Sequence, residues 1–259
     1  MKVYFIGAGP GASDLITLRG AKILGQSKIV LYAGSLIPDE MLQHCHPDAQ
    51  LLDTSKLDLE QQEACYRRAQ ESNCDVARLH SGDPTIYGAT AEQMRRLDAL
   101  EIEYEIVPGV PSFTAAAAQI KVELTKPEVS QSIILTRISG RASAVPELES
   151  IANLAQHRAT MCIFLSGPHL KKIVIDLLLH YPKDTPVALL YRATWPEQRS
   201  YQGSLGKVLK ETNGENWNLT TMLLVGSVLD NTLSTESSLY SKNFTHIFRV
   251  PKKNNKTES

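Results

Sequence analysis

Hydrophobic positions in the first 127 residues alternate between short continuous runs and segments with apolar residues every three or four positions. Short β-branched or aromatic runs are typical of strands, and the wider spacing is typical of amphipathic helices. The pattern predicts strands at residues 2–6, 28–32, 50–52, 75–80 and 103–107, and helices at residues 15–24, 59–71, 86–100 and 112–120. Because strands alternate with helix-length connections, we expect a parallel sheet covered by helices on both faces.

A second run of strands and helices follows a pause at Lys126 and Pro127, because proline disfavours helical angles in the residue before it. The predicted strands lie at residues 131–136, 160–165 and 187–191, with helices at 147–157 and 170–180. Residues 199–202 and 219–225 are expected to form a strand pair that closes this sheet. The predicted fold class is therefore α/β, with domains at residues 1–127 and 128–250 and a disordered polar tail at 251–259.

Composition indicates a globular protein without a pronounced charge. Of the 259 residues, 42% are hydrophobic and 21% charged, which is enough apolar surface for a sizeable core. The 27 Lys and Arg residues against 28 Asp and Glu residues give a net charge of −1, so a nucleic-acid-binding surface is not predicted. No run of 18 apolar residues occurs, so no membrane span is expected. The four cysteines form no C-x-x-C pair, which favours free thiols, no metal site and a cytoplasmic location.

Glycine and proline follow three of the predicted strands directly, in the loops GAGPG (residues 7–11), SGDP (81–84) and PGVP (108–111). Ligands of open α/β sheets bind at the carboxyl ends of the strands, so we expect these loops to share one rim and form a binding cleft. Glycine lets the backbone approach a ligand closely. The structural alternative is that the loops are tight turns, with Asp83 capping the helix that follows.

The first loop also fits the G-x-G-x-x-G/A pattern of dinucleotide-binding loops. Two features count against this interpretation. Pro10 lacks the backbone N–H that a pyrophosphate would need, and the second strand ends at Ala33 without an acidic residue for a ribose hydroxyl. A dinucleotide-dependent oxidoreductase is therefore kept only as an alternative function.

Together, the segments GAGPGASDLITLRG, LYAGSLIP, LHSGDPTIYGA and VPGVPSFTAAAA resemble the tetrapyrrole (corrin/porphyrin) methyltransferase family, and the resemblance extends over residues 2–250. The segments DTSKLDLEQ, AEQMRRL, ELTKP, ILTRISGRA and ATWPEQR resemble the branch that methylates carbon 11 of precorrin-4 or cobalt-precorrin-4 in cobalamin biosynthesis. The resemblance implies two α/β domains with a cofactor cleft between them, S-adenosyl-L-methionine as methyl donor, and a homodimer. Alternatives are methylation of another ring position and a non-catalytic tetrapyrrole-binding protein.

The resemblance also implies which residues bind the methyl donor. The family's donor-binding positions fall on Pro10, Ser81, Gly82, Asp83, Ile86, Pro111, Ser112, Leu165 and Ala193. Ser81 replaces the first glycine of the family's G-G-D loop. Tyr87 is a further candidate, which can stack on a ring or lie in the core. Uroporphyrinogen methylases carry an Asp after the second strand where this chain has Ala33, so the proton-acceptor role proposed for it does not transfer, which favours the later, precorrin-4 step.

A tetrapyrrole acceptor carries many carboxylates, so positive side chains are expected along the cleft. Arginine in particular suits bidentate recognition of a carboxylate. The candidates near predicted strand ends or loops are Lys56, Arg78, Arg137, Arg141 and Arg192. Each of them can instead be a solvated surface charge. No nucleophilic Ser or Cys is expected, because the enamine-like ring carbon is already nucleophilic and alignment is the main task, and the sequence does not identify a catalytic base.

Overall fold

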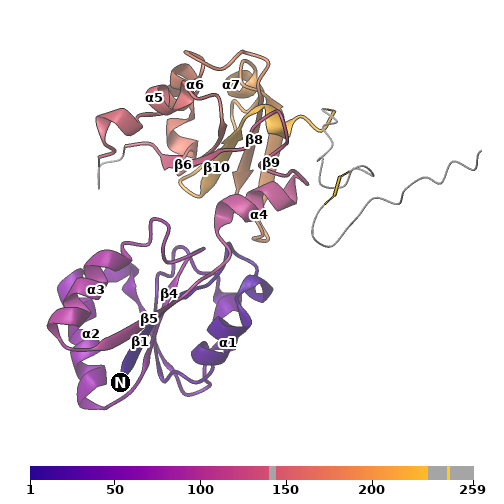
Figure 1. The fold of residues 1–259 in the computed structure, drawn as a ribbon. Helices are drawn as coiled ribbons and strands as arrows, with labels where there is room; N and C mark the ends of the chain where they lie inside the picture. The colour runs from indigo at the N-terminus through magenta and orange to yellow at the C-terminus, as the bar shows by residue number, and fades with distance from the viewer. Residues whose placement is uncertain (140–143, 233–243, 246–259) are drawn as a thin grey trace, which may run out of the picture.

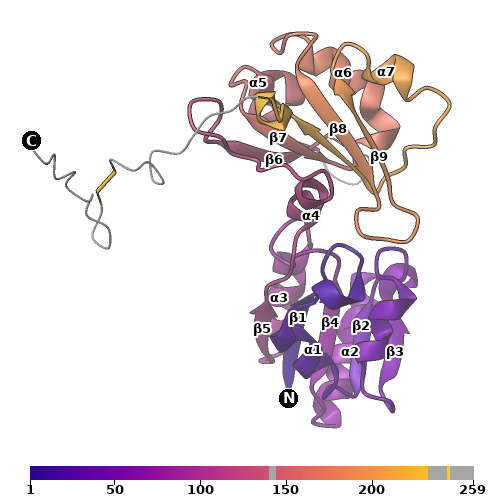
Figure 2. The same ribbon diagram turned by 90° about the vertical axis from the view of Figure 1, so that its right-hand side faces the viewer.

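The structure, a computed structural model, contains two five-stranded sheets and describes residues 1–139, 144–232 and 244–245. The two sheets belong to two stacked units, which Figure 1 shows one above the other and Figure 2 shows from the side. The predicted tail at residues 251–259 lies outside the described residues, as does Arg141.

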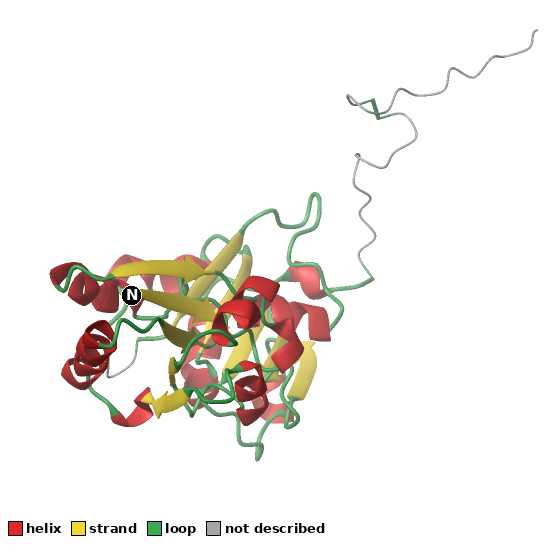
Figure 3. Cartoon of the chain, turned by 90° about the horizontal axis from the view of Figure 1, so that it is seen from below, coloured by secondary structure: helices red, strands yellow, loops and turns green. Residues whose placement is uncertain are grey.

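The N-terminal sheet is fully parallel, as the sequence predicts. Its strands are β1 (Lys2–Gly7), β2 (Ile29–Tyr32), β3 (Gln50–Asp53), β4 (Val76–His80) and β5 (Glu103–Val107), in the order β3-β2-β4-β1-β5. One face packs on α2 (Leu59–Glu71) and α3 (Thr90–Ala99), and the other on α1 (Leu18–Leu24). Figure 3 shows the helices around the strands. All carboxyl ends of the strands therefore meet at one edge.

The C-terminal sheet is mixed. Its strands are β6 (Ile133–Arg137), β7 (Thr160–Phe164), β8 (Pro186–Tyr191), β9 (Arg199–Ser204) and β10 (Thr221–Val225), in the order β6-β7-β10-β8-β9. The predicted pairing of the last two strands is wrong, because β10 lies antiparallel between β7 and β8 while β9 pairs with β8 at the edge. Every residue of β10 is buried, which suits a central strand, whereas the polar β9 suits an edge.

Helices complete the C-terminal unit. The helices α5 (Ile151–Ala155), α6 (Leu170–Leu177) and α7 (Val208–Glu211) cover one face of the sheet, and α4 (Ser112–Gln119) covers the other. Short 3₁₀ helices lie at Ser13–Leu15, Asp39–His44, Thr54–Lys56, Glu147–Glu149, Gly167–His169 and Ser227–Leu229.

The packing of α4 shows to which of the two units this helix belongs. Its buried alanines, Ala115 to Ala117, pack in one core cluster with Leu190 and Leu224 of the second sheet. Figure 2 shows α4 between the units, directly against the upper sheet. By packing, the N-terminal unit therefore ends at the PGVP loop and α4 begins the C-terminal unit, although the sequence pattern pauses only near residue 127.

Three helices begin later than the hydrophobic spacing predicts. The Thr17 side chain accepts from the N–H of Gly20 and so caps α1 after residue 17. Ser150 caps α5 in the same way. Before α3, Tyr87 and Ala89 adopt left-handed φ values of 54° and 49°, so the helix cannot extend back into the SGDP loop.

Candidate functional site

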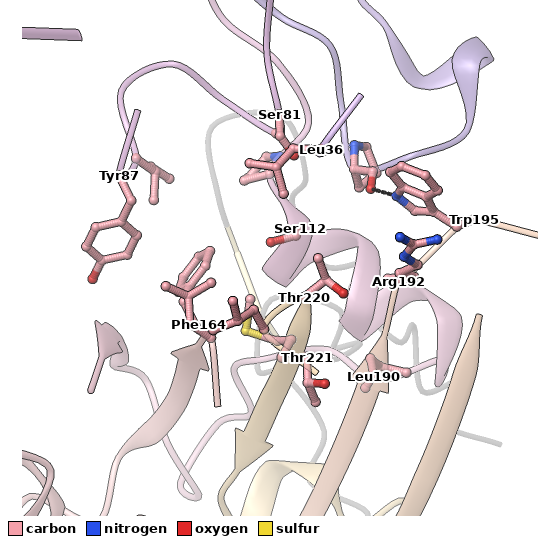
Figure 4. Close-up of a pocket in the computed structure, with 18 residues that line it drawn as sticks. Leu36, Ser81, Tyr87, Ser112, Phe164, Leu190, Arg192, Trp195, Thr220 and Thr221 are labelled. Carbon is pink, nitrogen blue, oxygen red and sulfur yellow. Dashed lines mark hydrogen bonds between the residues drawn. The ribbon is translucent and has the colours of Figure 1, made fainter. Parts of the chain in front are cut away.

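A pocket lies between the two units at the carboxyl edge of the parallel sheet. Eighteen residues line it: Pro10, Leu36, Ser81, Gly82, Ile86, Tyr87, Pro111 and Ser112 from the first 112 residues, and Phe164, Leu165, Leu190, Arg192, Ala193, Trp195, Leu219, Thr220, Thr221 and Met222 from the second sheet and its loops. In Figure 4, Tyr87 lies at one end and Trp195 with Arg192 at the other. We call this the inter-unit pocket.

The three glycine loops that form the N-terminal wall are tied together by their backbones. Gly82 donates its N–H to the carbonyl of Gly9 at 2.7 Å, and Gly9 donates in return at 3.2 Å. The backbone of Gly109 packs so closely that a Cβ there would lie 2.2 Å from the Gly82 carbonyl oxygen. Gly82 itself has a φ of 66°, which favours glycine. The middle of this wall is therefore backbone, with the side chains of Leu36, Ile86 and Tyr87 beside it.

The C-terminal wall is made of side chains from three adjacent strands. Phe164 ends β7, and Leu190 lies near the carboxyl end of β8. Because β10 runs antiparallel between them, its first residue, Thr221, pairs with Tyr191 at the same edge. The mixed order of this sheet thus brings residues from 164 to 222 onto one surface.

Eight of the nine residues that the resemblance assigns to donor binding line the inter-unit pocket, and so does the further candidate Tyr87. The exception is Asp83, whose carboxylate bonds to protein groups instead. It accepts from the backbone N–H groups of Thr85 and Gly109, each at 2.8 Å, and so joins the SGDP and PGVP loops. Burial favours a higher pKa for Asp83, but the bonds from Thr85 and Gly109 outweigh it and hold that pKa below its usual range. Asp83 therefore acts on the pocket through the loops it positions.

Arg192 is the one candidate cation among the lining residues. Its guanidinium lies 4.6 Å from the centroid of the Trp195 ring, and one Nη approaches the exposed Glu197 at 3.4 Å. Its Nε is buried and, within the described residues, has no hydrogen-bond partner. A buried donor without a partner is costly, so this nitrogen is suited to an anionic or carbonyl group of a ligand.

Arg137 lies beyond the other end of the pocket. Tyr87 separates the inter-unit pocket from a second cavity, which Arg137, Glu149 and Pro146 help to line. The Arg137 guanidinium is 5.9 Å from the Tyr87 ring centroid, and the Tyr87 ring meets Phe164 edge-on at 5.0 Å. Partial burial raises the pKa of the Tyr87 hydroxyl, while Arg137 opposes the rise.

Two other candidate cations do not lie at the pocket. Arg78 is buried inside the N-terminal unit, where its Nε donates to Gln93 at 3.3 Å and one Nη to the carbonyl of Leu79 at 3.2 Å. The structure does not bring Arg78 to the pocket, because β4 directs this side chain toward Gln93 of α3. Lys56 is exposed at the end of the 3₁₀ helix after β3 and lines neither the inter-unit pocket nor the cavity beside Arg137.

Comparison with known proteins identifies the family. The sequence profile of the Tetrapyrrole (Corrin/Porphyrin) Methylases matches residues 2–209. The chain belongs to this family. As a tetrapyrrole methylase it is a methyltransferase, and its two-unit α/β fold is that of the family, as the sequence predicts.

Individual relatives are similar over nearly the whole chain. A precorrin-4 C(11)-methyltransferase from Pseudomonas aeruginosa is 49% identical over 96% of this chain and 99% of its own. A cobalt-precorrin-4 C(11)-methyltransferase from Methanocaldococcus jannaschii is 40% identical over 96% of both chains. The X-ray structure of a cobalt precorrin-4 methyltransferase of cobalamin biosynthesis superposes with a TM-score of 0.85 at 39% identity, covering 88% of this chain and 96% of that one.

The methylase uses its GAGPG loop differently from a dinucleotide-binding protein. The N–H groups of Ala8, Gly9 and Ala12 all donate to protein acceptors and not outward. A short 3₁₀ helix at Ser13–Leu15 follows the loop and the α-helix α1 starts only at Leu18, so the loop does not lead directly into an α-helix as it does in a dinucleotide site. Family membership and this geometry together overturn the oxidoreductase alternative.

Several lining residues carried no signal in the sequence. Leu219 and Thr220 to Met222 belong to a segment without glycine or proline motifs, and Leu36 and Trp195 lie in segments that carry the family resemblance but were not assigned to a binding site. Only the central position of β10 would have placed residues 220–222 at the pocket.

The described residues contain neither a cluster of side chains suited to a metal ion nor a helix suited to span a membrane. Residues 1–139, 144–232 and 244–245 contain no group of three or more His, Cys, Asp and Glu side chains arranged to hold a metal ion. Over the same ranges, no helix combines the length and apolar character needed to cross a membrane.

Proposed function

We propose that the protein transfers a methyl group from S-adenosyl-L-methionine to carbon 11 of precorrin-4 or cobalt-precorrin-4. The observation that carries the proposal is the inter-unit pocket, which gathers eight of the nine donor-binding positions implied by the sequence resemblance, together with Tyr87. The substrate assignment is supported by the relatives, which are named for this step and are 40–49% identical to the chain.

The pocket's surface fits this donor. Leu165, Phe164 and Met222 offer apolar surface to a purine ring, and the glycine-loop backbone allows close approach of a narrow chain. Arg192 and Thr221 each contribute a buried polar atom that has no partner among the described residues. A ligand with an apolar ring system and several polar groups would satisfy such a wall.

The bound donor would supply a methyl group on a sulfonium centre. In the transfer the ring carbon provides the electron pair for the new C–C bond, while the S–CH₃ pair remains on sulfur, which leaves as a neutral thioether. The chain's own contribution is alignment and water exclusion, and orientation alone can provide about 7–11 kcal/mol of the barrier reduction. None of the lining residues is needed as a nucleophile.

The macrocycle's carboxylates require cations beyond the donor pocket. We assign this role first to Arg137, whose cavity adjoins the inter-unit pocket across Tyr87. Arg192 lies within the pocket and faces either the donor or the edge of the macrocycle.

The deciding experiment is incubation with methyl-labelled S-adenosyl-L-methionine and either precorrin-4 or cobalt-precorrin-4, followed by NMR of the product. Label at carbon 11 is expected with one or both acceptors. Label at another ring carbon would correct the position, and no label with a donor that still binds would leave only tetrapyrrole binding.

The family resemblance also leads to proposals for the oligomeric state and the cellular location. We propose a homodimer, which exposed apolar side chains such as Ile175 (53% exposed) and Leu179 (63% exposed) near the end of α6 support. Light scattering is expected to give twice the chain mass, and a single-chain mass at micromolar concentration would refute the dimer. The four cysteines are all free, which supports the proposed cytoplasmic location.

A further inference from the structure

Residues 192–198, the loop between β8 and β9, make two hydrogen bonds to the GAGPG loop of the other unit. The Thr194 hydroxyl accepts from the N–H of Ala12 at 3.0 Å. The indole Nε1 of Trp195 donates to the carbonyl of Pro10 at 2.9 Å, the dashed contact in Figure 4. We call residues 192–198 the cross-unit loop. These bonds join residues about 180 positions apart, so they hold the two walls of the pocket together.

Gly11 shows how closely the cross-unit loop fits its partner. A Cβ built on Gly11 would lie 2.3 Å from Cδ1 of Trp195, 2.6 Å from its Nε1 and 2.8 Å from Oγ1 of Thr194. All three nearest atoms belong to the cross-unit loop. Gly11 does not adopt a positive φ, so its lack of a side chain matters for this contact and not for its backbone conformation.

The cross-unit loop holds a strained conformation to make these contacts. Arg192 has a φ of 48° and the β-branched Thr194 a φ of 72°, which is unfavourable for such a residue. The N–H of Thr194 donates to Oε1 of Gln198 at 2.6 Å, and Gln198 donates to Gln119 of α4 at 3.0 Å. The hydrogen bonds of Gln198 hold the strained backbone of Thr194 in place. We infer that this conformation is needed to direct the side chains of Thr194 and Trp195 toward the GAGPG loop.

Trp195 also separates two cavities. Trp195 lines the inter-unit pocket. It also lines a second cavity, to which Asp14, Glu40 and Pro196 contribute. The Arg192 guanidinium lies over the same ring at 4.6 Å. A displacement of the indole would therefore open the pocket's end and move its one cation.

We propose that Thr194 and Trp195 are positioning residues for the methyl donor. They fix the carbonyl of Pro10 and the backbone of Ala12, and so set the width of the inter-unit pocket. The proposal rests on the proposed donor site. It requires that loss of either hydrogen bond weakens donor binding and leaves the chemical step at saturating donor nearly unchanged, because the residues touch the donor's surroundings and not the reacting atoms.

The first test compares isosteric and conservative variants. Thr194→Val keeps the shape and the β-branch but removes the acceptor, whereas Thr194→Ser keeps the hydroxyl. Calorimetry with S-adenosylhomocysteine is expected to show a Kd about 3- to 10-fold higher for Thr194→Val and for Trp195→Phe, and near the wild-type value for Thr194→Ser. The KM for the donor rises in parallel, while kcat at saturating donor stays within about twofold. Thr125→Val, in the connection between α4 and β6 and lining none of the cavities described here, is the matched control.

The second test approaches from the opposite unit. Gly11→Ala introduces a methyl group that meets only the cross-unit loop among its nearest atoms. It is expected to weaken S-adenosylhomocysteine binding in the wild-type background. In a Trp195→Ala background, which removes the two nearest atoms and leaves only Thr194 Oγ1 at 2.8 Å, the same substitution is expected to cause a clearly smaller loss than in wild type. This non-additivity identifies the contact between Gly11 and Trp195.

Tryptophan fluorescence can report donor binding at the cross-unit loop. The chain has two tryptophans, so each can be observed alone after the other is replaced. In Trp217→Phe the emission of Trp195 is expected to respond to S-adenosylhomocysteine at the calorimetric Kd, and in Trp195→Phe the emission of Trp217 is not. Equal affinities for wild type, Thr194→Val and Thr194→Ser, or additive effects of Gly11→Ala and Trp195→Ala, would overturn the positioning role. A wild-type protein that binds no S-adenosylhomocysteine would instead refute the proposed donor, which keeps the two failures apart.

Discussion

The two walls of the inter-unit pocket are built by opposite means. The N-terminal wall is built mainly from the backbone of three loops after parallel strands, interlocked through Gly9, Gly82 and Gly109. The C-terminal wall is side chains, such as Phe164 and Met222, carried by a sheet with a central antiparallel strand. The first wall can change little without breaking, whereas the second can change shape residue by residue. We infer that the N-terminal wall supports the donor in general and the C-terminal wall sets how tightly it is held.

The largest expected effect comes from filling the contact between the N-terminal loops. Gly109→Ala places a Cβ 2.2 Å from the Gly82 carbonyl oxygen and 2.7 Å from Cα of Gly7, both of which are backbone atoms that cannot rotate away. We expect the free energy of unfolding to fall by about 3 kcal/mol and donor binding to be lost. Urea unfolding and calorimetry measure the two effects.

Gly34→Ala is the control for this variant, since its new Cβ approaches only the carboxylate of Asp53, which can move. A loss of stability in Gly34→Ala as large as in Gly109→Ala would contradict the view that the loop interlock is the sensitive feature.

The next effect is a pH dependence of the free energy of unfolding, and it originates in the N-terminal unit. Burial, assisted by the nearby Arg78 charge, lowers the pKa of His80 to about 3 from the usual 6.5. Below pH 6.5 the unfolded chain therefore binds a proton that the folded chain does not, and stability falls on acidification from pH 6.5 toward pH 3. The slope reaches about 1.4 kcal/mol per pH unit.

His80→Phe keeps a ring beside Phe5, whose centroid is 5.7 Å away, and removes this titration. Urea unfolding between pH 5 and pH 7 is expected to show a flatter stability profile for His80→Phe than for wild type. The same replacement at the exposed His157 of the C-terminal unit serves as control. Identical slopes for wild type and His80→Phe would show that His80 is not held neutral.

A smaller effect is expected from the side-chain wall. Leu165 is 44% exposed, so Leu165→Ala is expected to have little effect on stability. Loss of its apolar contact is worth about 1 kcal/mol, or roughly a fivefold higher Kd for S-adenosylhomocysteine. Leu148→Ala, at a leucine 82% exposed in the same unit, should leave the Kd unchanged. Equal affinities for all three proteins would remove Leu165 from the donor wall.

The smallest effect concerns the acceptor. Arg137→Ala is expected to raise the KM for the tetrapyrrole by about threefold at low salt and to flatten its salt dependence, because exposed ion pairs are screened over about 8 Å at physiological ionic strength. The KM for the donor should barely change. Arg95→Ala, on the exposed side of α3, is the control. A salt dependence in Arg137→Ala as steep as in wild type would place the acceptor's carboxylates elsewhere.

The same contrast explains how far the sequence could be interpreted. The N-terminal wall was predictable because its glycines and prolines follow local strand patterns, and parallel strands bring those loops together without further information. The C-terminal wall depended on where β10 inserts, and strand order among residues far apart in sequence has no local signature. Arg78 shows the same limit, because its strand position was predicted but the face of β4 that carries it was not.

The most direct test of the account is a crystal structure of the chain with S-adenosylhomocysteine. The account predicts density between the SGDP loop and the side chains of Leu165 and Met222, with the Trp195 to Pro10 bond retained. Density confined to the cavity beside Arg137 and Glu149, with the inter-unit pocket still open, would contradict the assignment of the pocket as the donor site.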